Sequence, residues 1–438
     1  MRGCHRLAKG ISIACGLAVF TVPFVAVAAK KPRTPPAPRI TAAMRAASLR
    51  RVNGYLDSSF KGTLLQAGAL VPILEQFYRL SGGLSHDPIH IIHYGDSHTA
   101  ADELTAALRD SFKEKFGDGG SGFSLAGRPF AGYRRLDAPG GGTPFWHSDG
   151  FRSASGDGML GLGGMSITSD RAGQSVYLDT ECDFLEIDYL QQPDGGTMAL
   201  YDSDRFLEDI PTAGELGPGF VRYAVPPGPH RFMLKTVDAR PVRLFGWVAD
   251  KQTGVTYEAL GINGAEAGVI MKWDANLLAT YLQRRDPGMI VLAYGTNEAS
   301  DPFWTHEDYE ALFSSLLQRL RQDAPTASIL VLGPPDRWVR VKGGWHPMDA
   351  IDRIIAAEQA ACRENGCTFW DTRQRMGGKG SMRDWVYSGL AQRDYVHFTA
   401  PGYHRLADAL FSDLMRQYEA YRKTRQEITD QIPYGPAK

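Results

Sequence analysis

Cysteine is scarce in this chain, with five among 438 residues. Cys362 and Cys367 form a close Cys-x4-Cys pair. Without a second pair or a neighbouring histidine, such a pair does not predict a zinc site. In an oxidising compartment the pair has two open fates, a disulfide or two free thiols, because short loops often fail to meet disulfide geometry.

An excess of charge of either sign is also missing. Lysine and arginine number 48, aspartate and glutamate 49, and the formal net charge is −1 at pH 7. There is therefore no electrostatic basis for expecting nucleic acid as a partner. With 43% hydrophobic and 22% charged residues, the composition is that of a soluble globular protein. Its length suffices for one large domain and a smaller one.

A long apolar run occurs at the N-terminus. A basic start precedes the uncharged stretch GISIACGLAVFTVPFVAVAA, and Ala26-Val27-Ala28 fits a small-residue cleavage site. Residues 1–29 are therefore predicted to be a signal peptide, with a retained membrane anchor as the alternative. Cleavage would leave no stable membrane span, and the protein is expected to be periplasmic or otherwise exported. Residues 30–50, which include KKPRTPPAPR, are predicted to be a Pro-rich linker.

Two patterns alternate along the rest of the chain. Residues 51–140 and 256–425 carry apolar strands alternating with amphipathic helices, which predicts a parallel sheet covered on both faces. Residues 141–255 carry short β-type runs between turn signals, which predicts a small inserted β-sandwich. The glycine-rich stretch 117–164 is expected to form loops, and 426–438 a C-terminal tail. The predicted fold class is α/β, a three-layer parallel sheet with this insert.

Four short stretches lie at predicted strand ends or before the last helix, where active groups gather in a parallel sheet: GDSH, GINGA, YGTNE and DYVHFTAPG. Together they supply what acyl transfer requires. His397 can take the proton of the Ser97 hydroxyl, and Asp394 can orient and stabilise the resulting imidazolium. The backbone N–H groups of Ser97 and Gly264 and the side-chain amide of Asn297 can form an oxyanion hole.

The order Gly-Asp-Ser, Gly, Gly-x-Asn, Asp-x-x-His resembles the SGNH (GDSL) hydrolase superfamily. The resemblance implies that its four name residues are Ser97, Gly264, Asn297 and His397. The family usually has Gly-x-Asn-Asp, whereas this chain has Glu298 at the fourth position, which is not the oxyanion donor. The β insert between the serine and glycine blocks, with the FGDGGSGF stretch, is similar to the periplasmic peptidoglycan O-acetylesterases. In those proteins the insert is carbohydrate-binding-like.

Other motifs favour structural interpretations. The segment GDGMLG, residues 156–161, satisfies G-x-G-x-x-G but lacks the strand and helix of a dinucleotide site. His90 and His93 would face opposite sides of one strand, which favours core or surface positions over a metal site. His98 either borders the site or caps the next helix. A G-x-S-x-G elbow is missing, which argues against a lipase-like α/β-hydrolase plan.

These observations predict an exported serine esterase that removes O-acetyl groups from a polysaccharide, with peptidoglycan as the expected partner. The reaction would pass through an acetyl-serine intermediate, and neither a metal nor an organic cofactor is implied. Two alternatives stay open: an O-acetyltransferase using the same residues on a cell-envelope or secreted glycan, and a glycan-binding protein with a vestigial hydrolase domain. The sequence leaves the oligomeric state undetermined.

Overall fold

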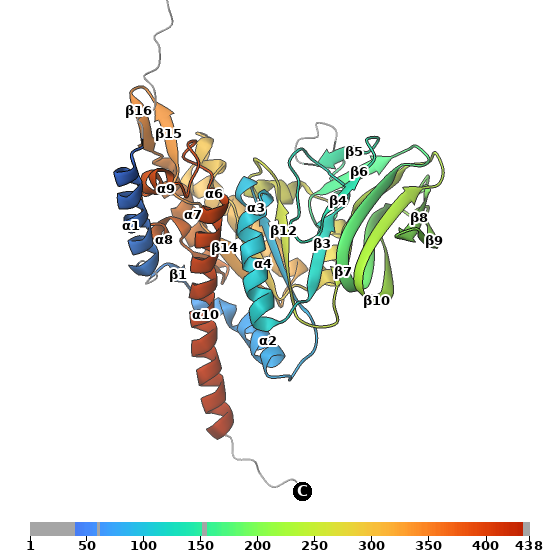
Figure 1. Ribbon diagram of the computed structural model, residues 1–438, viewed down its shortest axis with the longest axis horizontal. Coiled ribbons are helices and arrows are strands. Elements are labelled where there is room, and N and C mark those ends of the chain that lie inside the picture. The colour runs from blue at the N-terminus through green and yellow to red at the C-terminus, as the bar shows by residue number, and fades with distance from the viewer. Residues whose placement is uncertain (1–39, 59–61, 151–155, 432–438) are drawn as a thin grey trace, which may run out of the picture. The chain divides into compact units, whose positions relative to one another are not determined.

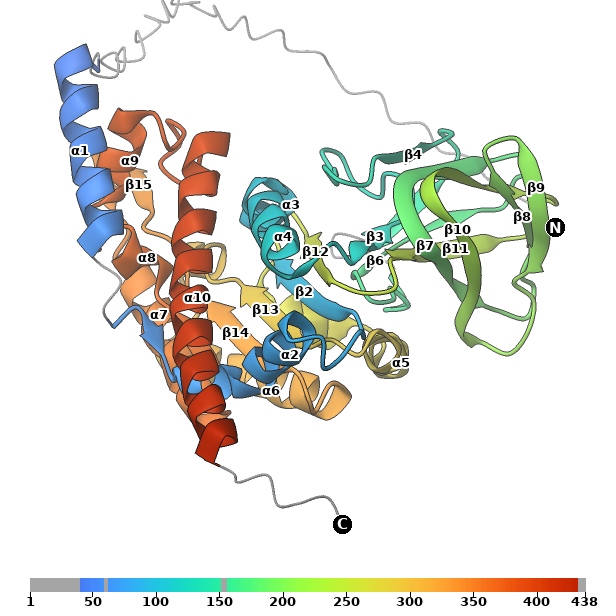
Figure 2. The same cartoon turned by 60° about the horizontal axis from the view of Figure 1, so that its bottom comes forward.

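A computed structural model describes residues 40–58, 62–150 and 156–431. The predicted signal peptide, residues 1–29, and the Pro-rich part of the linker lie outside these ranges. The described residues from Thr41 onward belong to one compact unit, in which an α/β domain and a β domain are seen side by side (Figures 1 and 2).

The α/β domain is built on a six-stranded sheet whose order is β1-β17-β14-β13-β2-β12. The last five strands of this order are parallel, and the short edge strand β1 runs antiparallel to β17. Their bounds are β1 Leu64–Leu65, β2 Ile89–Gly95, β12 Val255–Gly261, β13 Met289–Ala293, β14 Ser328–Leu332 and β17 Thr368–Trp370. Burial on both faces explains why these strands are almost continuously apolar in sequence. The predicted parallel sheet is confirmed.

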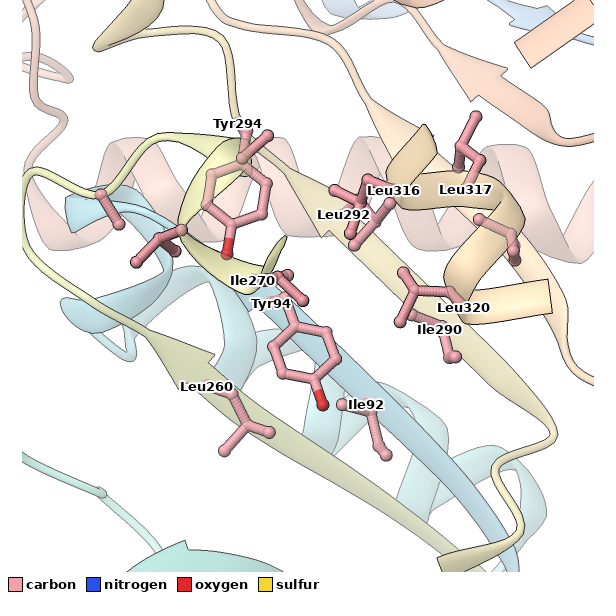
Figure 3. Packing of buried hydrophobic residues seen from close by; sticks show 14 of the residues in the cluster. Ile92, Tyr94, Leu260, Ile270, Ile290, Leu292, Tyr294, Leu316, Leu317 and Leu320 are labelled. Carbon is pink, nitrogen blue, oxygen red and sulfur yellow. The ribbon is translucent and has the colours of Figure 1, made fainter. Parts of the chain in front are cut away.

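Helices cover both faces of this sheet, because side chains alternate along each strand. Ile92 and Tyr94 of β2 enter one core, which Figure 3 shows, and Ile89 and Ile91 enter the other. The first core is closed by α5 (Ala275–Arg285), α6 (His306–Asp323) and α7 (Ala350–Glu364). The second is closed by α1 (Ala42–Ser58), α2 (Val71–Ser81), α4 (Glu103–Phe116), α9 (Met382–Ser388) and α10 (Ala400–Gln431).

Short elements complete the α/β domain. They are the 3₁₀ turns η1 (Ala67–Leu70), η2 (Ala267–Lys272) and η3 (Glu298–Ser300), the short helices α3 (Ser97–Ala100) and α8 (Thr372–Arg375), and the hairpin strands β15 (Trp338–Val341) and β16 (Gly344–Pro347). Among the helices that the structure describes, none has both the length and the apolar character that crossing a membrane requires.

The β domain is a nine-stranded antiparallel network with its own hydrophobic core. Its main path is β5-β6-β11-β7-β10-β8-β9; β3 pairs with β11, and β4 with β7. The bounds are β3 Gly120–Leu125, β4 Gly140–Gly142, β5 His147–Gly150, β6 Met165–Ser169, β7 Ser175–Gln191, β8 Thr197–Asp202, β9 Arg205–Pro211, β10 Gly217–Thr236 and β11 Val242–Asp250. The inserted β domain is confirmed, with its strands joined in one network rather than in two separate sheets.

The insert begins earlier than residue 141, where the sequence pattern placed its start. Residues 120–125, expected to form a loop, are strand β3 of the β domain. The glycines that suggested a loop serve a close approach between strands. Gly122 has φ +66°, and a Cβ on it would lie 2.5 Å from Oε1 of Glu258 on β12. At the other end, β11 stops at Asp250 and the chain enters the parallel sheet at Val255.

Three further sequence expectations are corrected. The predicted linker 30–50 is too long, since α1 begins at Ala42. The predicted tail 426–438 is partly helical, since α10 continues to Gln431. The PPGP turn signal does not end a strand but lies inside β10, where the register against β7 shifts between Ala224 and Gly228. A bulge absorbs these residues without breaking the antiparallel pairing.

Cys182, Cys362 and Cys367 are free, buried thiols, so the disulfide alternative for the Cys362/Cys367 pair is not realised. Cys362 lies in the last turn of α7 and Cys367 just before β17, and both enter the same core. Burial raises the pKa of Cys367 to about 11 and raises that of Cys362 further. Disulfide formation requires a thiolate, which this environment disfavours.

Candidate active site

Ser97 begins α3 immediately beyond the carboxyl end of β2, and the backbone allows only glycine at the turn. A Cβ on Gly95 would lie 2.1 Å from Oγ1 of Thr99, and a Cβ on Gly261 would lie 2.1 Å from the backbone nitrogen of Ala100. Gly95 and Gly261 are register partners at the ends of β2 and β12. These two glycines therefore let α3 sit directly on the sheet edge and hold Ser97 there.

The side chains of Ser97, His397 and Asp394 form a hydrogen-bonded chain. Oγ of Ser97 lies 2.9 Å from Nε2 of His397, and Nδ1 of His397 lies 2.8 Å from Oδ2 of Asp394. The other carboxylate oxygen of Asp394 accepts the backbone N–H groups of Val396 (3.0 Å) and His397 (3.1 Å). This arrangement allows His397 to receive the proton of Ser97, with its ring held by Asp394.

Asp394 keeps its negative charge in this environment. Partial burial alone would raise its pKa, but the hydrogen bonds from His397 and from the two backbone N–H groups together lower it to about 2. The side chains of Asp394 and His397 are 43% and 35% exposed, so that water has access to the group.

An aromatic cluster supports the loop that carries Asp394 and His397. Tyr395, between them in sequence, has φ +59°, a left-handed conformation that is unusual for tyrosine. Its ring stacks against Trp338 (5.6 Å between centroids) and Trp345 (4.6 Å), and its carbonyl accepts the N–H of Trp338 (3.1 Å). The hairpin β15–β16 thus holds the strained residue in place. Neither this hairpin nor its role was predicted from the sequence.

Gly264 and Asn297 follow neighbouring strands and reach the same edge of the sheet. Gly264, beyond β12, has φ +76°, which favours glycine. Asn297, beyond β13, donates from Nδ2 to the carbonyl of Ala265 (2.8 Å) and lies 3.5 Å from Oδ2 of Asp96, the residue before Ser97. The structure therefore gathers all the predicted site residues, although their roles as nucleophile, base and oxyanion donors stay predictions.

Asp96 and His98 flank Ser97 and are both buried. Asp96 caps α3 by accepting the N–H of His98 (2.8 Å), and burial raises the pKa of its carboxyl to about 6. Nδ1 of His98 lies 3.0 Å from the hydroxyl of Tyr403, and its ring centroid lies 5.3 Å from that of His397. Burial lowers the pKa of His98 to about 3, so this ring is neutral. Of the two alternatives for His98, the structure favours a residue that borders the site.

A small cavity of about 40 Å³ lies beside Asp96 and His98, with a mostly apolar lining that includes Trp370 and Phe398. This volume accommodates a few water molecules. Within the described ranges, no three histidine, cysteine, aspartate or glutamate side chains are grouped so that they could hold a metal ion.

The remaining histidine and glycine motifs have structural positions. His90 and His93 are buried, and each lies within hydrogen-bond distance of a different residue of β12, Thr256 (3.0 Å) and Tyr257 (2.9 Å). The GDGMLG segment is followed by turns and strand β6, not by the helix that a dinucleotide site needs. Asp157 within it pairs with Arg243 at 2.6 Å.

Comparisons with known proteins agree with this geometry. The model of the GDSL-like Lipase/Acylhydrolase family matches residues 234–405, which include Gly264, Asn297, Asp394 and His397. A solved structure of a peptidoglycan O-acetylesterase is similar with a TM-score of 0.71 and 25% identity, over 82% of this chain and all of that one. No curated protein matches the sequence.

Two family two carbohydrate esterases are also similar, at much lower TM-scores. The enzyme from Clostridium thermocellum has a TM-score of 0.30 and 13% identity, over 63% of this chain and 98% of that one. The enzyme from Cellvibrio japonicus has a TM-score of 0.28 and 12% identity, over 64% of this chain and 98% of that one.

The fold, the clustered residues and the partial family match are similar to those of SGNH-type (GDSL-like) esterases, with an inserted β domain. More narrowly, the chain resembles the peptidoglycan O-acetylesterases in fold over most of its length.

Proposed function

We propose that this protein is an exported serine esterase that removes O-acetyl groups from peptidoglycan. The observation that carries the proposal is the hydrogen-bonded chain from Ser97 through His397 to Asp394. The similarity to a peptidoglycan O-acetylesterase supports this choice of substrate, and the apolar N-terminal sequence supports export.

In the proposed reaction, Oγ of Ser97 attacks the acetyl carbonyl carbon while its proton moves to Nε2 of His397. The oxyanion of the tetrahedral intermediate accepts N–H groups from Ser97, Gly264 and Asn297. Collapse of the intermediate breaks the bond to the sugar oxygen, which takes the proton from His397 and leaves as a hydroxyl. Ser97 is then acetylated.

Water completes the cycle by the same steps. His397 removes a proton from a water molecule, whose oxygen attacks the acetyl carbonyl, and the second intermediate collapses to release acetate. Ser97 recovers its proton from His397. Asp394, which stays ionised throughout, stabilises the imidazolium that forms in each half of the reaction. The exposure of His397 leaves its ring accessible to water.

We assign recognition of the polymer to the β domain. The chain enters this domain after α4, which follows Ser97, and returns through β12 just before Gly264. Figures 1 and 2 both show strand β4 nearer to α3 than strands β8 and β9 are. A glycan held there would have its acetyl groups positioned close to Ser97, which raises reactivity by orientation alone.

The deciding experiment incubates purified protein with O-acetylated peptidoglycan and measures released acetate, with Ser97→Ala as control. Release by the wild type alone supports the proposal. Transfer of acetyl to an added sugar, without free acetate, would favour the acetyltransferase. Glycan binding with neither product would favour the vestigial hydrolase. Parallel reactions with O-acetylated xylan test whether the substrate is peptidoglycan in particular.

A further inference from the structure

Glu298, the residue at which the chain departs from the usual Gly-x-Asn-Asp pattern, is fully buried beside Asn297. Its carboxylate joins two loops. Oε2 accepts the N–H of Gly295 (2.9 Å), which begins the loop of Asn297, and Oε1 accepts the N–H of Ala267 (2.7 Å), which ends the loop of Gly264. One side chain thus connects the two loops that carry the predicted oxyanion donors other than Ser97.

We infer that Glu298 is a positioning residue that holds the Gly264 and Asn297 loops together so that their N–H groups converge beside Ser97. The inference rests on the proposed ester cleavage at Ser97. Glu298 itself would touch no substrate atom. An oxyanion hole requires donors fixed before the charge develops, and a two-acceptor carboxylate between the loops provides that fixation.

A second buried carboxyl group, that of Glu358, contacts the same tyrosine hydroxyl as Glu298 does. The hydroxyl of Tyr309 on α6 lies 3.3 Å from Oε1 of Glu298 and 3.0 Å from Oε1 of Glu358 on α7. Tyrosine has one hydroxyl proton and cannot donate to both. The shorter of the two contacts is the one in which Tyr309 donates to Glu358, and burial, with the charge of Glu298, raises the pKa of the Glu358 carboxyl well above its usual value.

The arrangement makes positioning depend on the charge of Glu298. Burial raises its pKa to about 7, and the N–H of Ala267 opposes this rise. Two titratable groups face Glu298 from the helices: Tyr309 on α6 and Glu358 on α7. Two more face it from the loops after β2 and β12, Asp96 and Glu266, and the negative charges of these two raise the pKa of Glu298 further. When pH falls below about 7, Glu298 takes up a proton, and one of its oxygens ceases to be a free acceptor. One loop contact then weakens.

The test compares Glu298→Gln with Glu266→Gln, which removes a carboxylate from the same region without touching either loop contact. The glutamine amide has one oxygen, so either Gly295 or Ala267 loses its acceptor in both orientations of the side chain. At pH 8 we expect Glu298→Gln to lower kcat for p-nitrophenyl acetate at least about tenfold, a fraction of what losing one oxyanion donor costs, with KM within about twofold. Glu266→Gln should stay within about twofold of wild type.

The pH dependence separates positioning from a purely structural role. Between pH 8 and pH 6 the wild type becomes protonated at Glu298 and approaches the glutamine variant, so the ratio of their kcat values should shrink. A ratio that stays constant with pH, or an equal loss of kcat in Glu266→Gln, would overturn the inference.

Amide hydrogen exchange gives a readout that needs no turnover. Glu298→Gln should speed exchange at Gly295 or Ala267 at least about tenfold, as expected for losing a buried hydrogen bond. In the wild type alone, exchange at these amides, corrected for its intrinsic pH dependence, should quicken from pH 8 to pH 6. If the wild type cleaves no ester, the proposed function fails, while exchange still decides whether Glu298 holds the loops. Unchanged exchange in both measurements refutes the positioning role.

Discussion

Oγ of Ser97 lies 2.9 Å from Nε2 of His397, although 300 residues separate the two along the chain. The parallel sheet accounts for the meeting. Ser97 leaves the carboxyl end of β2, and His397 lies on the loop that leads into α10. The whole β domain is inserted between them in sequence without disturbing this distance, because both of its junctions lie in the α/β domain.

Replacing any member of the hydrogen-bonded chain should cripple ester cleavage. Ser97→Ala and His397→Ala should each lower kcat by roughly 10⁴–10⁶-fold, since serine and histidine act as a unit. Asp394→Ala should be the mildest of the three, because the carboxylate assists the base rather than reacting. Initial rates on p-nitrophenyl acetate measure the effect, and thermal melting checks folding. Near-wild-type turnover of folded Ser97→Ala would refute the mechanism.

Asn297→Ala should lower kcat by roughly 10²–10³-fold, or about 3–4 kcal/mol of transition-state stabilisation. In the resting site Nδ2 donates to the carbonyl of Ala265 (2.8 Å) and lies 3.5 Å from Oδ2 of Asp96, and we predict that the N–H not used by Ala265 serves the oxyanion. The variant also loses the Ala265 contact, so melting temperature is measured alongside kinetics. A fall in melting temperature with unchanged kcat would show that Asn297 only stabilises its loop.

The β domain should affect reaction with the polymer and leave reaction with a small ester unchanged. Phe145, 46% exposed between β4 and β5, is the test position, and the guanidinium carbon of Arg171 lies 4.4 Å from its ring centroid. Phe145→Ala should slow acetate release from insoluble peptidoglycan severalfold, while p-nitrophenyl acetate turnover stays within about twofold.

Phe206→Ala provides the matched control for this experiment. Phe206 is 51% exposed on strand β9, far from α3 in both views of the molecule (Figures 1 and 2). The Phe206→Ala variant should release acetate from peptidoglycan and turn over p-nitrophenyl acetate at the rates of the wild type. Equal losses on both substrates in Phe145→Ala would indicate damaged folding, and no loss on either would count against recognition at this position. The aromatic residues Tyr189 and Trp247 of the β domain are buried and therefore unsuitable as contacts for a glycan.

Acid should destabilise the fold through His93, which is fully buried. Burial lowers its folded-state pKa to about 3 from 6.5. Below pH 6.5 His93 therefore binds a proton in the unfolded chain but not in the folded chain. The free energy of unfolding consequently decreases as pH falls below 6.5. Between pH 7 and pH 5 this loss amounts to about 2 kcal/mol. In urea unfolding, the free energy of unfolding of His93→Phe relative to that of the wild type should rise by about 2 kcal/mol between pH 7 and pH 5. Parallel pH curves for the two proteins would contradict the assignment.

Local patterns in the sequence sufficed for much of the architecture and for the site residues. The alternation of apolar strands and amphipathic helices indicated the parallel sheet, and Ser97, Gly264, Asn297 and His397 could be recognised because each follows a strand or precedes a helix. Such signals are short-range, and each depends on residues within a few positions of one another. The same reasoning failed for residues 117–164, because glycines required by the contact between β3 and Glu258 look like loop glycines in sequence.

What only the tertiary structure decided depends on residues that are distant in the chain. The ring of Tyr395, a residue in the left-handed conformation, stacks against Trp338 and Trp345. The hydroxyl of Tyr309 contacts the carboxyl groups of both Glu298 and Glu358, which lies on another helix. No periodicity or motif records these contacts, because they arise where separate elements pack against one another. Burial has the same character: the pKa of a carboxyl or imidazole is shifted by everything around it, and its surroundings exist only once the chain has folded.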